Sequence, residues 1–270
     1  MDIKKRIQMI APLSRKEQKK LVATGDVELM RQYISKKTLS LELAETAQIA
    51  LVKTGNLEFI KAYNDEFGLC TKAQVAVVKT GNMELITAVN IYADEAVAEL
   101  IKSADVKFLK NYLSHATLDD KGELALVRLQ NVELLKIYVG RYNKYFTIGY
   151  DAQNELVKMA NLEMLKAYLK DHGFDEAAQI RVIKSKNVEI FKIYISHDDF
   201  LMEVEAKLVE TGDIERIKCY FNKYRFSPPA EEELLKLGNE KLIAAYEKRW
   251  GVERNLHVKC FFRPGDDGDL

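Results

Sequence analysis

The chain has 270 residues, of which 47% are hydrophobic and 30% are charged, a composition typical of a folded protein rather than a disordered one. Its 41 Lys and Arg residues balance its 41 Asp and Glu residues, and this neutrality argues against a generic binder of polyanions. Three scattered cysteines (Cys70, Cys219 and Cys260) predict neither a disulfide framework nor a zinc site, and no apolar run is long enough for a signal peptide or a membrane span. We therefore expect a cytoplasmic protein with reduced thiols, acting in a host cytosol if it is a secreted or viral factor.

A nine-residue phrase recurs along the chain and predicts its architecture. The clearest copies run from Gly55 to Tyr63 and from Gly212 to Tyr220, and both follow the pattern Gly-Asn/Asp-apolar-Glu-X-Ile-Lys-X-Tyr. Further copies start at Gly25, Gly81, Ala104, Gln130, Ala160, Lys186 and Gly238, so that most successive copies are 26 residues apart. Such a fixed period indicates a repeat protein, in which each unit packs only on its neighbours.

Each repeat is expected to contain two short helices. In the copy at residues 41–66, residues 43–52 carry an apolar stripe at helical spacing, and Gly55 is placed to close this first helix in a left-handed turn. Asn56 is the predicted N-cap of a second helix whose apolar stripe includes Tyr63. The capping position is Asn or Asp in all nine copies, namely Asp26, Asn56, Asn82, Asp105, Asn131, Asn161, Asn187, Asp213 and Asn239.

The period is interrupted at three places. Residues 35–41 form a longer connection, the short step from Gly81 to Ala104 compresses the linker at residues 90–92, and residues 140–150 are an insertion. The repeat ends after Trp250, and residues 251–270 are expected to be a flexible acidic tail. The sequence thus predicts an all-α solenoid of about nine helix-turn-helix repeats over residues 1–250.

The segment Thr54–Lys61, which reads Thr-Gly-Asn-Leu-Glu-Phe-Ile-Lys, resembles the helix-turn-helix core of ankyrin repeats. The resemblance covers residues 14 to about 250. Ankyrin repeats are about 33 residues long with a Thr-Pro-Leu-His turn, whereas here the period is shorter, that turn does not occur and the linkers leave no room for the projecting β-hairpin. The resemblance therefore implies a hairpin-less, ankyrin-like α-solenoid, and it implies protein binding without identifying a partner.

Three rows of side chains repeat with the period, and each has a functional and a structural interpretation. A tyrosine row, broken at Val89, could stack bases or peptides or could be a packed row at the edge of the core. Its members are Tyr33, Tyr63, Tyr112, Tyr138, Tyr168, Tyr194, Tyr220 and Tyr246. A basic row could follow a phosphate backbone or could complement helix dipoles. A Gln/Glu row could supply acid–base groups or could form hydrogen bonds between repeats. The basic row comprises Lys53, Lys79, Lys102, Arg128, Lys158, Lys184 and Lys236.

No catalytic, cofactor-binding or metal-binding residues are predicted, because the four histidines form no metal-ligand pattern and no nucleotide-binding or nucleophile motif occurs. The predicted function is non-catalytic binding of a protein or peptide, and the alternative is nucleic-acid binding through the basic and tyrosine rows. The predicted partner-binding residues lie in the aperiodic insertion, where aromatic and basic side chains cluster as they do at interfaces, unless these rings only fill an irregular repeat. They are Arg141, Tyr142, Tyr145, Phe146 and Tyr150.

Overall fold

The computed structural model describes residues 7, 13–35, 42–142 and 146–251, and these residues form helices and no β-strand. The prediction of an all-α fold is therefore confirmed at this level. The chain divides into two compact units, Met1–Arg141 and Tyr142–Leu270, which are described separately below. Within the described ranges, no helix has the length and apolar character that crossing a bilayer requires. The predicted tail falls outside the described residues except for Gly251.

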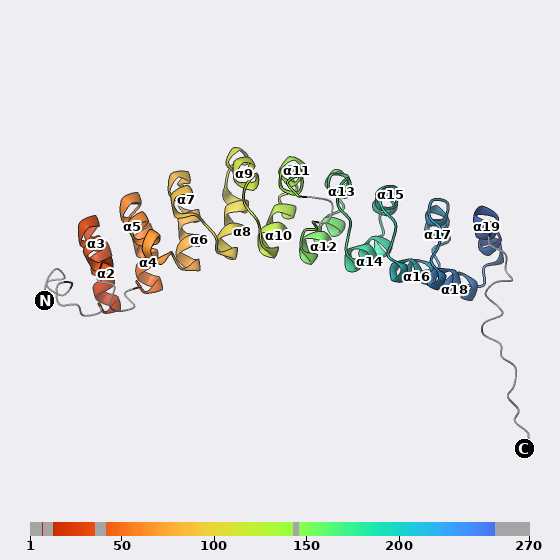
Figure 1. Ribbon diagram of the computed structural model, residues 1–270, viewed down its shortest axis with the longest axis horizontal. Coiled ribbons are helices and arrows are strands. Elements are labelled where there is room, and N and C mark those ends of the chain that lie inside the picture. The colour runs from red at the N-terminus through yellow and green to blue at the C-terminus, as the bar shows by residue number, and fades with distance from the viewer. Residues whose placement is uncertain (1–6, 8–12, 36–41, 143–145, 252–270) are drawn as a thin grey trace, which may run out of the picture. The chain divides into compact units, whose positions relative to one another are not determined.

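The first unit is a series of helix pairs (Figure 1). First helices pack on the next first helices, α2 on α4, α4 on α6, α6 on α8 and α8 on α10. Second helices likewise pack α3 on α5, α5 on α7 and α9 on α11. The helices are α2 (Arg15–Thr24), α3 (Val27–Ile34), α4 (Glu45–Lys53), α5 (Leu57–Phe67), α6 (Thr71–Lys79), α7 (Met83–Val89), α8 (Asp94–Ser103), α9 (Val106–Leu113), α10 (Asp120–Arg128) and α11 (Val132–Val139).

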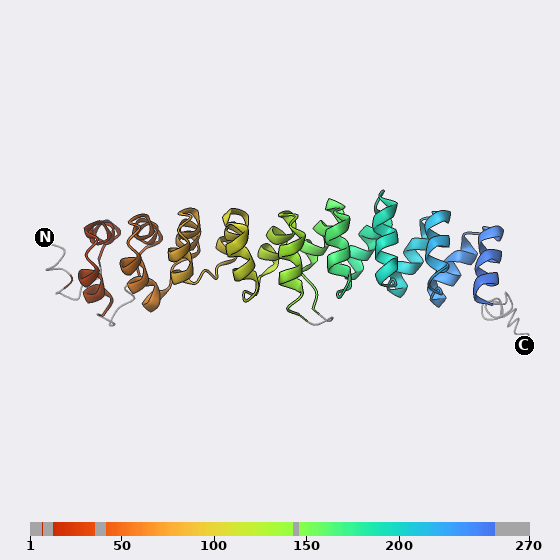
Figure 2. The same cartoon turned by 90° about the horizontal axis from the view of Figure 1, so that it is seen from above.

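The second unit is built in the same way (Figures 1 and 2). Its first helices α12, α14, α16 and α18 pack in succession, and so do its second helices α13, α15, α17 and α19. Their bounds are α12 (Tyr150–Met159), α13 (Leu162–Leu169), α14 (Glu176–Lys184), α15 (Val188–His197), α16 (Met202–Glu210), α17 (Ile214–Phe221), α18 (Pro228–Lys236) and α19 (Glu240–Trp250).

The predicted N-caps start the second helices. At all nine positions, the Asn or Asp side chain accepts a hydrogen bond from a backbone N–H in the first turn of its helix. Gly55 also has the expected left-handed backbone, with φ of 65°. Gln130 and Ala160 adopt the same conformation at φ of 54° and 56° without being glycine. These two turns carry backbone strain that glycine would relieve.

Candidate functional site

The tyrosine row is structural. Seven of its rings are at most 3% exposed, so they offer no face on which a base could stack: Tyr33, Tyr63, Tyr138, Tyr168, Tyr194, Tyr220 and Tyr246. The hydroxyl of Tyr63 accepts a hydrogen bond from the Leu43 N–H at 2.9 Å, across its own helix pair. Equivalent bonds, each to an N–H 20 residues earlier in the chain, occur at Tyr138, Tyr220 and Tyr246. In these four helix pairs the tyrosine therefore ties the second helix to the connection that precedes its partner helix, whereas Tyr168 and Tyr194 donate to carbonyls in the connection that follows their own helix.

The Gln/Glu row is also buried, and it links consecutive helix pairs. Gln48 Nε2 donates to the Leu43 carbonyl oxygen at 2.7 Å, while Gln48 Oε1 accepts from the N–H of Cys70, at the start of the next pair, at 2.7 Å. Gln74, Gln153 and Gln179 repeat this arrangement. An amide side chain suits the position because it donates and accepts at once. Of the structural interpretations of this row, hydrogen bonds between consecutive helix pairs are the ones present.

Where glutamate replaces glutamine, the tyrosine hydroxyl of the same helix pair donates a hydrogen bond to the carboxylate. The Tyr220 hydroxyl donates to Glu205 Oε1 at 2.6 Å, and Glu205 Oε2 accepts from the Ser227 N–H at 2.8 Å. Tyr138 with Glu123, and Tyr246 with Glu231, form the same bond. Burial raises the pKa of Tyr220, and the hydrogen bond and charge of Glu205 raise it further. Glu205 is thus fixed as an acceptor between helix pairs, and Glu123 and Glu231 are fixed as acceptors within theirs, which leaves the acid–base interpretation without support.

The basic row is exposed at every position. Two of its members form ion pairs three residues apart on their own helix, Lys158 with Glu155 at 3.4 Å and Lys236 with Glu233 at 2.6 Å. Exposed pairs of this kind contribute about 0.2–1 kcal/mol to stability. The basic row remains accessible to an external anion such as a phosphate group. Nucleic-acid binding is predicted to use the tyrosine row as well, and that row is buried.

The predicted partner-binding residues have different environments. Arg141, in the first unit, donates from its guanidinium to the carbonyl oxygens of Leu113 at 2.7 Å and His115 at 3.0 Å, and also to that of Ala116. It thereby satisfies carbonyls at the C-terminal end of α9, which an isolated helix leaves without partners. Tyr145 lies outside the described residues.

In the second unit, Tyr142 and Phe146 are half-buried and stack on each other, with ring centroids 3.7 Å apart. The carbonyl of Phe146 is 2.9 Å from Nδ1 of the buried His172, and the two rings meet edge to face. Tyr150, the first residue of α12, is 59% exposed. The structure thus brings Tyr142 and Phe146 together against the chain itself and directs Tyr150 to solvent. Their role as partner anchors stays a prediction.

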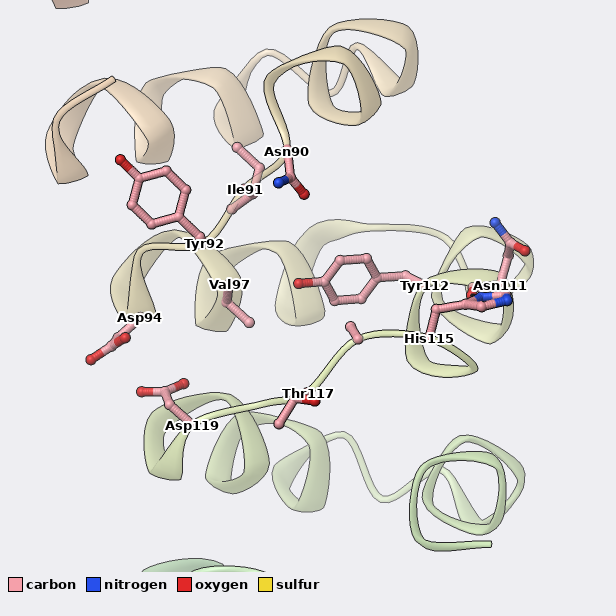
Figure 3. Close-up of a pocket in the computed structure, with 11 residues that line it drawn as sticks. Asn90, Ile91, Tyr92, Asp94, Val97, Asn111, Tyr112, His115, Thr117 and Asp119 are labelled. Atoms are coloured by element: carbon pink, nitrogen blue, oxygen red, sulfur yellow. Dashed lines mark hydrogen bonds between the residues drawn. The ribbon is translucent and has the colours of Figure 1, made fainter. Parts of the chain in front are cut away.

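The structure adds a site that the predicted residues do not include. A pocket of about 490 Å³ lies in the first unit, between the connection from α7 to α8 and the connection from α9 to α10 (Figure 3). Asn90 and Ile91 line one side, Val97 of α8 and Tyr112 of α9 form the base, and Asp94 and Asp119 face each other at one end. A smaller cavity of about 160 Å³ between α7 and α9 shares Asn90, Ile91 and Tyr112 with it.

Two signals in the sequence marked this position. The step from Gly81 to Ala104 is only 23 residues, and Val89 stands where other pairs have tyrosine. The shortened connection places Tyr92 so that its hydroxyl donates to the Leu69 carbonyl oxygen at 3.3 Å, next to the position where a tyrosine at 89 would be expected to bond. Aperiodicity was thus a better indicator of the pocket than aromatic clustering was.

Arg141 connects the predicted site to the pocket. His115 and Ala116, whose carbonyls it binds, both line the pocket wall. Its guanidinium therefore holds the α9–α10 connection in place. Among the described residues, no group of three or more His, Cys, Asp or Glu side chains is arranged to hold a metal ion. Comparison with protein-family models, curated proteins and solved structures finds no match to this chain.

Proposed function

We propose that this protein is a non-catalytic, protein- or peptide-binding scaffold, whose helix pairs are about nine repeats of one ankyrin-like α-solenoid. The repeats described in each unit use their recurrent polar side chains for hydrogen bonds within and between helix pairs, as Gln48 and Tyr220 illustrate. What varies from repeat to repeat at the surface is then available for recognition. In repeat proteins, such extended surfaces are the binding sites.

The observation that carries the proposal is a set of exposed apolar side chains where first helices begin in the second unit. Tyr150 and Met202 each occupy the first residue of a first helix, and they are 59% and 56% exposed. Leu201, the N-cap of α16, is 46% exposed. Tyrosine and methionine are enriched at protein interfaces, and these side chains contribute little to the core.

Nucleic-acid binding is the alternative, and the exposed basic row favours it. Its weakness is that base stacking needs exposed aromatic faces, whereas the tyrosine row is buried. Binding through the basic row alone would be independent of sequence and would weaken steeply with added salt. We therefore rank it second.

Photo-crosslinking distinguishes the two functions. Benzoylphenylalanine is placed at position 202 in one sample and at position 184, which belongs to the basic row of the same unit, in another. The scaffold predicts adducts from position 202 that are sensitive to protease and resistant to nuclease, with fewer from position 184. Nuclease-sensitive adducts concentrated at position 184 would contradict the scaffold and support the alternative.

A further inference from the structure

The pocket in the first unit lies where the period is irregular. Val89 stands in the tyrosine row there, the connection is shortened, and a cavity of about 160 Å³ lies between the second helices α7 and α9. The larger pocket opens from the same residues, and its volume of about 490 Å³ falls in the range of ligand sites.

Tyr112 is the member of the tyrosine row whose hydroxyl lines this pocket. At Tyr63 and Tyr220, the hydroxyl accepts a hydrogen bond from the backbone N–H 20 residues earlier in the chain. For Tyr112 the equivalent N–H belongs to Tyr92, and it donates instead to Gln74 Oε1 at 3.0 Å. Within the described residues, the Tyr112 hydroxyl makes no hydrogen bond. Burial raises its pKa and the charge of Asp119 adds to that, so the group is protonated at neutral pH and able to donate and accept.

The charged groups of the lining are negative. Asp94 and Asp119 face each other across one end of the pocket (Figure 3), and no lysine or arginine lines it. Two cations adjoin the wall, and both are engaged: Lys121 pairs with Glu95 at 2.6 Å, and Arg141 binds the carbonyls of the α9–α10 connection. The pKa of Lys121 is raised mainly by Glu95, with further contributions from Asp94 and Asp119, as a negative potential at this end requires.

The rest of the lining mixes polar side chains, among them Asn90, Asn111 and Thr117, with an apolar part formed by Ile91 and Val97. Ile91 and Val97 are each 6% exposed, and the Tyr112 ring extends toward Val97 (Figure 3). An apolar base next to a carboxylate pair suits a side chain with a hydrocarbon stem and a cationic head, because such side chains bury the stem and keep the charge at the polar end. A tyrosine ring adds attraction for a cation placed over its face.

We propose that this pocket binds an arginine or lysine side chain of a partner peptide. The stem lies along Ile91 and Val97, and the head lies between Asp94 and Asp119 within reach of the Tyr112 hydroxyl. This inference rests on the proposed binding of a protein or peptide and assigns one specificity pocket to it. Arg141 acts as a positioning residue that fixes the wall.

The test is a titration followed by amide NMR signals of Asn111 and Thr117, both in the lining. The probes are Nα-acetylarginine amide, Nα-acetyllysine amide, the neutral isostere Nα-acetylcitrulline amide and the anionic Nα-acetylglutamate amide. Saturable shifts are expected with the two cations. The citrulline probe is expected to bind about tenfold more weakly, since a charge-assisted hydrogen bond is lost.

The variant Asp94→Asn with Asp119→Asn should weaken arginine binding by a similar factor. It should remain folded, because asparagine can replace Asp119 as the N-cap of α10 and because Asp94 is exposed and caps no helix. Asp120→Asn is the matched control, since Asp120 is also the first residue of a first helix but is absent from the pocket lining. Equal binding of citrulline and arginine, tighter binding of the glutamate probe, or an undiminished arginine affinity in the double variant would each overturn the assignment.

These results are separable from the proposed function. If the arginine probe fails while position 202 still yields protease-sensitive adducts, the pocket assignment is wrong and the scaffold stands. If arginine binds as expected but position 202 yields no protein adduct, the pocket assignment holds and the apolar surface in the second unit is the incorrect part.

Discussion

Gln74 gives the sharpest prediction about how consecutive helix pairs are joined. Its side chain is fully buried, and it makes three hydrogen bonds: Nε2 donates to the Leu69 carbonyl at 2.8 Å, and Oε1 accepts from the N–H groups of Tyr92 at 3.0 Å and Ala93 at 2.9 Å. Gln74→Leu keeps the approximate shape and removes all three bonds. Each unmade bond to a buried backbone group costs about 1–3 kcal/mol.

The apolar gain from burying leucine offsets about 1–2 kcal/mol of this loss. Three lost bonds cost about 3–9 kcal/mol, so the expected net destabilisation is about 1–8 kcal/mol. Urea unfolding followed by circular dichroism measures the total. Hydrogen exchange of the Tyr92 and Ala93 amides measures the local effect, because a part of a structure can open without global unfolding.

Lys72→Leu is the control on the same helix. Lys72 is exposed and pairs with Glu45 at 3.0 Å, so its loss should change stability by less than about 1 kcal/mol. If Gln74→Leu costs no more than this control and the two amides stay protected from exchange, the Gln/Glu row does not join the helix pairs as described.

Four further outcomes are expected. Asn161→Ala removes the N-cap of α13 and should cost about 0.5–2 kcal/mol in thermal unfolding; an unchanged melting temperature would mean that the cap is dispensable. Ala160→Gly should raise stability by up to about 1 kcal/mol by relieving the left-handed backbone, and a loss of stability would contradict that strain. Glu205→Gln should change stability by less than about 1 kcal/mol, because the amide can accept from Ser227 as the glutamines of the row do, and a loss comparable to that of Gln74→Leu would refute their equivalence. Burial raises the folded-state pKa of Tyr220 above the ordinary value of about 10, so its contribution to stability is complete below about pH 10 and is lost as the pH rises further. Tyrosinate absorbance at 295 nm should therefore develop together with the loss of helix. Ionisation of all tyrosines before unfolding would contradict this prediction.

The elements that repeat were predictable from the sequence, because local chemistry determines them. An Asn or Asp before an apolar stripe supplies the missing acceptor at a helix start, and Asn161 does this as expected. A residue that recurs on an apolar stripe, such as Tyr63, is buried for the same reason in seven helix pairs, whereas Tyr112 lines the pocket. The exchange of glutamine for glutamate is also visible in the sequence. The hydrogen bond that the glutamate receives from the tyrosine of the same pair, as between Glu205 and Tyr220, was not predictable because it depends on contacts between helices.

The candidate site was predictable only in part. The short step near residues 90–92 was evident, yet nothing local indicates that Asp94 and Asp119 come to face each other across a pocket. The aromatic residues of the insertion at 140–150 indicate an interface by composition alone. Two of them, Tyr142 and Phe146, stack on each other, and Arg141 binds backbone carbonyls. Composition shows which side chains are suited to an interface, whereas their availability depends on the tertiary structure.

The most direct test of the proposed scaffold is quantitative partner capture by the wild-type chain and by the variant Leu201→Ser with Met202→Ser. Both side chains are exposed, so the variant should melt within a few degrees of the wild type. Glu203→Ser, on the same turn of α16, is the matched control. The scaffold predicts that a protein captured by the wild type and by the control binds the double variant at least about tenfold more weakly, as expected when interface anchors are truncated. Equal capture by all three chains, or capture of nucleic acid in place of protein, would contradict it.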